Sequence, residues 1–191
     1  MPSTLRALAL AFALVSLGTI MMPVFLVDDF ARDGVSALGT RWQTFSDRVM
    51  GGASNGEATF ETIEGHRCLR LRGQVSLENR GGFVQAALPL VERSGSFDAG
   101  RFKGIRLQVR GNGAVYYVHL RTEDTRLPWQ YYEAGFEAGS AWRQIDIPFT
   151  AFSPENLSAA LDTGGLKRLA IVAAKRAFSA DVAVAGIEFY E

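Results

Sequence analysis

Residues 105–110 read IRLQVR, and this short stretch decides the fold. Its apolar side chains, Ile105, Leu107 and Val109, alternate with polar ones. Successive side chains of a strand point to opposite faces, so the run predicts a strand with one dry face and one wet face. Half-buried strands of this kind are typical of antiparallel sheets. The same alternation recurs in residues 69–77, LRLRGQVSL, and in residues 144–149, QIDIPF.

Similar apolar runs predict further strands at residues 24–30, 58–63, 83–88, 115–122, 129–136, 166–173 and 182–190. Hairpin turns are expected at Glu64-Gly65, Gly111-Asn112-Gly113 and Ala138-Gly139-Ser140. In the last run the apolar parity changes at Gly186, which predicts a β-bulge. About ten short strands, with turns about every ten residues, predict an all-β sandwich or barrel.

Helical patterns of any length are missing after residue 23. One short helix is expected to start at Ser153-Pro154-Glu155 and to run to about Leu161. Proline is tolerated at the first helical position, and Ser153 is a good capping residue.

Composition limits the classes of function. The chain has 191 residues, which fit one domain, and it is 48% hydrophobic, which is enough for a core. Twenty basic and 20 acidic residues cancel, and this balance argues against nucleic acid as the main partner. The only cysteine, Cys68, excludes an intrachain disulfide and a multi-cysteine metal site. We interpret Cys68 as a small residue on a strand.

The N-terminus carries an uncharged apolar stretch from Ala7 to Val27, preceded by Arg6. Its length and its small residues Ser16-Leu17-Gly18 fit a secretory signal. We therefore assign residues 1–22 to a signal peptide or an N-terminal membrane anchor and residues 23–191 to a single β-sandwich domain. The predicted location is exported or membrane-anchored. The alternative is a cytoplasmic protein with a misassigned start.

Catalytic motifs are not evident. The sequence holds two histidines, and no GxSxG, HExxH or Walker pattern occurs. His119 shares its parity with Val115 and Tyr117, as expected for a residue on one face of a strand. The acidic pairs Asp28-Asp29 and Glu123-Asp124 are typical of strand ends and turns, with calcium as a minority alternative. We predict a protein that is not an enzyme and has neither a metal nor another cofactor.

Two double glycines are the most unusual local feature. They lie in Met50-Gly51-Gly52-Ala53-Ser54 and in Asn79-Arg80-Gly81-Gly82-Phe83, each at the edge of a predicted strand. A structural interpretation is a tight turn that needs positive φ. A functional interpretation is a loop whose backbone approaches a partner closely. Two similar pairs favour a shared surface.

Aromatic residues gather between Trp129 and Trp142, and the group also includes Tyr131, Tyr132 and Phe136. Exposed Trp and Tyr side chains are what a carbohydrate-binding face or a protein hot spot uses. Core packing accounts for at least half of them. A carbohydrate-binding module that uses these aromatics is therefore the alternative function.

Residues 42–54, WQTFSDRVMGGAS, closely resemble the W-x-x-x-x-D-x-V-M-G-G-x-S signature of the complex I intermediate-associated protein family. Weaker similarities follow in the family's order, at residues 27–30, 81–83, 110–118 and 142–152. The resemblance implies a galactose-binding-like jelly roll. It also implies an assembly factor for respiratory complex I (NADH:ubiquinone oxidoreductase) or for another protein complex, without chemistry of its own.

The expected partner is therefore a protein, such as a subunit or an assembly intermediate of a membrane complex, and no nucleic acid is expected. The predicted partner-binding residues surround the two glycine pairs, and they are Trp42, Asp47, Met50, Gly51, Gly52, Ser54, Gly81, Gly82 and Phe83. No catalytic residues are assigned.

Overall fold

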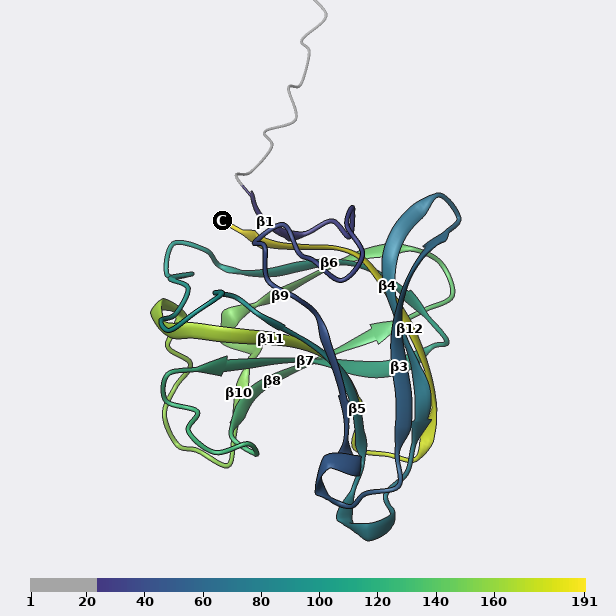
Figure 1. Cartoon of the computed structure of the whole chain (residues 1–191). Coiled ribbons are helices and arrows are strands. Elements are labelled where there is room, and N and C mark those ends of the chain that lie inside the picture. The colour runs from purple at the N-terminus through teal and green to yellow at the C-terminus, as the bar shows by residue number, and fades with distance from the viewer. Residues whose placement is uncertain (1–23) are drawn as a thin grey trace, which may run out of the picture.

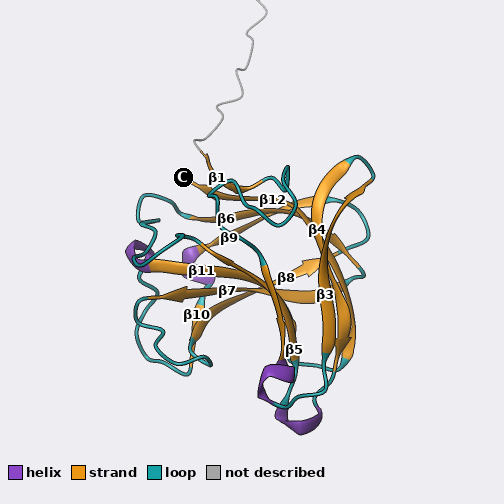
Figure 2. Ribbon diagram, in the orientation of Figure 1, coloured by secondary structure: helices purple, strands orange, loops and turns teal. Residues whose placement is uncertain are grey.

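The computed structural model describes residues 24–191, so the signal or anchor predicted at residues 1–22 lies outside the described residues. Two antiparallel sheets of six strands each pack face to face (Figure 1, Figure 2). The all-β jelly-roll sandwich is thereby confirmed.

The first sheet has the order β3-β4-β12-β6-β9, and β1 also pairs with β12. Its strands are β1 (Val24–Asp28), β3 (Asn55–Ile63), β4 (His66–Val75), β6 (Gly104–Gly111), β9 (Arg143–Pro148) and β12 (Phe178–Tyr190). The register between β12 and β6 shifts between Val184 and Gly186, so the predicted β-bulge is confirmed.

The second sheet has the order β10-β8-β7-β11-β5-β2. Its strands are β2 (Gln43–Ser46), β5 (Phe83–Pro89), β7 (Ala114–Thr122), β8 (Tyr131–Ala138), β10 (Ser153–Glu155) and β11 (Leu166–Ala174). The short strands β2 and β10 form its two edges, and short edge strands give little opportunity for pairing with other chains.

The core lies between the sheets, where the apolar side of each alternating run points. Fully buried side chains from both sheets fill it, among them Leu69, Leu71, Ile105, Leu107, Val118, Leu120, Tyr132 and Ile171. Full burial of one such side chain contributes about 1.5–3 kcal/mol, so the alternating runs carry the stability of the sandwich.

The helix predicted from Ser153 to about Leu161 is wrong. Residues 153–155 form β10, which pairs with β8 as an edge strand, and Asn156 then takes a positive φ of 58°. Pro154 has no N–H to donate, which suits an edge strand as well as a helix start, and the tertiary pairing decides between them.

Helical turns in the described residues are all short 3₁₀ segments. They are η1 (Asp47–Met50), η2 (Glu78–Arg80), η3 (Phe149–Ala151) and η4 (Thr163–Gly165). None of the helices described between residues 24 and 191 has the length and apolar character that crossing a membrane requires.

Candidate functional site: the loops around Asp47

The two glycine loops lie together at one end of the sandwich, beside the start of β5 at Phe83 and away from the C-terminus (Figure 1). The side chain of Asp47, which is fully buried, joins them. Its carboxylate accepts hydrogen bonds from the backbone N–H groups of Ser54 (2.9 Å), Gly82 and Phe83 (3.3 Å) and from the Ser54 hydroxyl (2.5 Å). One carboxylate therefore fixes two segments that are far apart in the sequence.

Each glycine pair combines two different requirements. Gly51 ends η1 in the left-handed region with φ of 86°, and Gly82 has φ of 139°. A Cβ on Gly52 or on Gly81 would come within 2.3 Å of the Asp47 carboxyl group. One glycine of each pair thus supplies a positive φ, and the other leaves room for the buried carboxylate.

The hydrogen bonds keep Asp47 ionised. Burial acts to raise the pKa of its carboxyl group, but the bonds from Ser54, Gly82 and Phe83 outweigh burial and hold the pKa below its usual value. A buried carboxylate with donors on both oxygens is a stable structural anchor.

Three large apolar side chains stand exposed on these loops. Val49 is 71% exposed, Met50 62% and Leu77 51%, and Leu77 reaches across toward Gly82. We call these three side chains, together with Gly51-Gly52 and Gly81-Gly82, the tip surface. Sequence reasoning included Met50 but missed Val49 and Leu77, although Val49 precedes Met50 directly.

The nine predicted partner-binding residues do not all meet. Eight of them belong to the tip or its support: Ser54 and Asp47 are buried beneath the loops, and Phe83 packs partly buried on the outer face of the second sheet. Trp42 lies at the opposite end of β2, where its indole N–H donates to Asp28 (2.7 Å) and its ring contacts Phe30. Its place at the site stays a prediction.

The aromatic residues between 129 and 142 do not form one face. Tyr132 and Phe136 are buried in the core, whereas Trp129 is 54% exposed. Tyr131 stacks on His119 in the second sheet, and Trp142 lies against His66 of the first. A continuous aromatic platform for a sugar chain is therefore not present among the described residues.

His119 lies on the outer face of β7 opposite Glu133 of β8. His119 Nε2 and the Glu133 carboxylate are 3.0 Å apart, and Lys175 pairs with the second oxygen of Glu133. Burial lowers the pKa of His119, against the opposing effect of Glu133, so the imidazole tends to stay neutral. The sequence indicated the face of His119 but not its partner Glu133, which lies 14 residues further along the chain, nor the Lys175 that pairs with Glu133.

Metal ligands do not gather in the described part of the chain, where no group of three or more His, Cys, Asp or Glu side chains is placed to hold an ion. The Cys68 side chain is buried on β4, and burial raises the pKa of its thiol. The interpretation of Cys68 as a small strand residue is thereby supported by its position.

Fold and loops together define a galactose-binding-like β-sandwich with an organised tip. The model of the family described as "Complex I intermediate-associated protein 30 (CIA30)" matches residues 31–177. Because the match spans most of the chain, the chain belongs to this family.

A curated relative is the mitochondrial Complex I intermediate-associated protein 30 of Mus musculus. It is 28% identical over an alignment of 140 residues, and the alignment covers 65% of this chain and 42% of that protein. The aligned part thus covers less than half of the relative. Its name places that protein in mitochondria, and none of the comparisons supports the expected export of this chain.

Similar solved structures are carbohydrate-binding modules. The family 11 module of the cellulase Lic26A-Cel5E of Clostridium thermocellum has a TM-score of 0.69 and 13% identity, covering 89% of this chain and 95% of that one. A family 30 module has a TM-score of 0.58 and 14% identity, covering 88% of both chains. At such low identity the likeness shows the fold alone.

Proposed function

We propose that this chain is a non-enzymatic assembly factor that binds a protein partner through the tip surface. The exposure of Val49, Met50 and Leu77 on a pair of loops fixed by Asp47 carries the proposal. Membership of the complex I intermediate-associated family supports a subunit or assembly intermediate of respiratory complex I as the partner. Catalytic chemistry has no part in this role.

The rigidity of the tip supports binding. Ordering a flexible loop on association costs free energy, and a loop that is already held in place avoids that cost. Ser54 extends the support, because its hydroxyl also accepts a hydrogen bond from the Ser76 N–H (2.9 Å) beside Leu77. The exposed apolar side chains are therefore presented by a fixed backbone.

The predicted residues divide into two roles under this proposal. Met50, an adaptable side chain suited to apolar partner surfaces, contacts the partner together with its neighbour Val49. Asp47 and Ser54 lie beneath the tip surface and hold the loops. The glycine backbones at the surface let a partner approach closely.

The experiment is capture of complex I subunits from native membranes, measured by mass spectrometry. Leu77→Ser removes one exposed apolar side chain from the tip and should lower the yield of complex I subunits at unchanged folding. Leu127→Ser is the matched control, because Leu127 is 43% exposed outside the tip. Equal capture by both variants and the wild type would exclude the tip as the binding surface.

A carbohydrate ligand is the second candidate, and the 54% exposure of Trp129 is the observation in its favour. Titration with soluble β-glucans would detect it by isothermal calorimetry. Binding that Trp129→Ala abolishes, with normal partner capture, would assign a sugar-binding role beside the tip.

We propose that residues 1–22 direct export or membrane attachment of the domain at residues 23–191. The uncharged run before Asp28 supports this. Fusing residues 1–30 to a reporter that is active only outside the cytoplasm tests it. A silent reporter, together with full-length protein in the soluble cytoplasmic fraction, favours a misassigned start and a cytoplasmic protein.

A further inference from the structure

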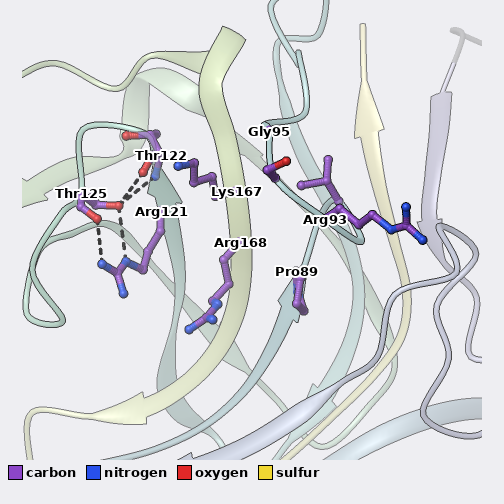
Figure 3. A pocket seen from close by; sticks show the side chains of 10 residues that line it. Pro89, Arg93, Gly95, Arg121, Thr122, Thr125, Lys167 and Arg168 are labelled. Atoms are coloured by element: carbon purple, nitrogen blue, oxygen red, sulfur yellow. Dashed lines mark hydrogen bonds between the residues drawn. The ribbon is translucent and has the colours of Figure 1, made fainter.

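A pocket of about 360 Å³ lies at the Pro89 end of β5, where β7, β11 and β5 are neighbours in the second sheet, whereas the tip adjoins the Phe83 end of β5. Its walls come from residues 89–95, from residues 121–125 and from the start of β11 at residues 167–168 (Figure 3). Neither the partner-binding proposal nor the aromatic cluster uses this pocket.

The charge of the pocket is of one sign. Four of its ten lining residues are cationic, and no carboxylate lines it; the cations are Arg93, Arg121, Lys167 and Arg168. None of the four forms an ion pair with another described residue. The whole chain has a formal net charge of zero, so this excess is local.

Two of the cations are direct cross-strand partners. Arg121 of β7 stands opposite Arg168 of β11 in the register, and Arg168 stands opposite Pro89 of β5. Like charges directly opposite each other on one face of a sheet destabilise it. The register of β11 against β7 shifts between Leu166 and Arg168, so Lys167 has no partner on β7. Lys167 lines the same pocket as Arg168, the next residue in the chain.

Arg121 is held in place without being neutralised. Its guanidinium donates to the carbonyl oxygens of Thr125 (2.8 Å) and Leu127 (2.9 Å), and its Nε donates to the Thr125 hydroxyl (3.3 Å). Figure 3 shows the two bonds from Arg121 to Thr125, with Arg168 on the neighbouring strand. Burial, and then the charge of Arg168, lowers the pKa of Arg121, which indicates that the cation lacks a compensating anion.

We propose that this pocket binds a ligand bearing phosphate groups, with Arg121 and Arg168 holding one phosphate between them. The Arg168 guanidinium matches phosphate oxygens in bidentate fashion, and the Nη1 group of Arg121 takes no part in the bonds to Thr125 and Leu127. Together with Lys167, the two arginines suit a ligand with more than one negative charge. The bound anion relieves the repulsion between the facing arginines. Either a soluble phosphorylated metabolite or a phospholipid headgroup supplies this chemistry.

The test uses inorganic pyrophosphate as the probe, with thermal unfolding and isothermal calorimetry as readouts. Saturating pyrophosphate should raise Tm by about 2–4 °C over sodium chloride of equal ionic strength. Arg168→Gln should abolish this rise, and without ligand it should unfold no earlier than the wild type because it removes a like-charge pair. Arg121→Gln is the second variant, and Arg41→Gln, at an exposed arginine outside the pocket, is the control.

Vesicles of phosphatidylcholine with and without phosphatidylglycerol distinguish the two sources. A response to pyrophosphate that the pocket variants lose supports a soluble ligand. Binding only to the anionic vesicles, again lost in the pocket variants, supports a headgroup. Absence of both responses, or an equal response in the Arg168→Gln and Arg41→Gln proteins, would overturn the proposal. The inference is independent of the tip surface, so failure of either leaves the other standing.

Discussion

The backbone N–H groups of Ser54, Gly82 and Phe83 all donate to Asp47, and no other described side chain accepts from them. The shape of the tip therefore depends on Asp47. An amide in its place keeps one acceptor oxygen but turns an N–H₂ group toward backbone N–H groups. A buried donor left unpaired costs about 1–3 kcal/mol.

We therefore expect Asp47→Asn to lower the free energy of unfolding by at least about 1–3 kcal/mol, measured by urea denaturation. Asp98→Asn is the control, since Asp98 is exposed and accepts one bond from the Gly100 N–H (2.8 Å). A loss no larger than that of the control would mean that Asp47 does not hold the loops.

The same carboxylate predicts a pH dependence. The folded-state pKa of Asp47 is lowered from 3.8, so its contribution to stability is fully present above about pH 4. That contribution is lost as the pH falls through the lower folded-state pKa. The Asp47→Asn protein should lack this part of the acid transition, which unfolding curves at a series of acidic pH values would measure.

The glycine pairs give a second prediction at this scale. Gly51→Ala meets open space but keeps φ of 86°, at a cost of about 1–2 kcal/mol. Gly52→Ala places a Cβ 2.3 Å from the Asp47 carboxyl carbon, so it should destabilise the domain more than Gly51→Ala does. Melting temperatures of the two variants give the order, and the reverse order would contradict the packing described.

Among the elements, the long alternating strands could be predicted from sequence, because a half-buried strand leaves a period of two in residues such as 105–109. The edge strands β2 and β10 could not. β10 has three residues, and β2 has one large apolar side chain, Phe45, so neither carries a readable pattern. Their pairing depends on neighbours distant in sequence.

The candidate site was predictable in part for a similar reason. The two glycine pairs can be read directly from the sequence. The hydrogen bond from the Gly82 N–H to Asp47, however, joins positions 35 residues apart. Positive φ, the structural interpretation of these pairs, applies to Gly51 and Gly82. The close approach of Gly52 and Gly81 to a buried carboxylate has no local signal.

The pairing of β7 with β8 gives a prediction for His119. Because burial lowers its folded-state pKa from 6.5, the unfolded chain binds the proton more tightly. Stability should therefore be full above about pH 6.5 and should fall as the pH drops toward the folded-state pKa. His119→Gln should flatten this part of the profile in urea denaturation between pH 7 and pH 5. An unchanged slope would mean that another group titrates there.

For the whole molecule, the fold shared with carbohydrate-binding modules does not decide the function, because sandwiches of this kind present different sites on one scaffold. The family membership and the tip surface point the same way, toward a protein partner. The basic pocket adds a separate site within the same domain, so partner capture and phosphate binding are separable by variants at Leu77 and at Arg168.

The central claim is that the tip surface contacts a complex I assembly intermediate, and site-specific photo-crosslinking in native membranes tests it most directly. A photo-reactive amino acid incorporated at Met50 should give an adduct with a complex I subunit, identified by mass spectrometry. The same group incorporated at Leu127, also exposed but outside the tip, should give none. A complex I adduct from Leu127 alone, or no complex I subunit crosslinked to a folded protein labelled at Met50, would contradict the account.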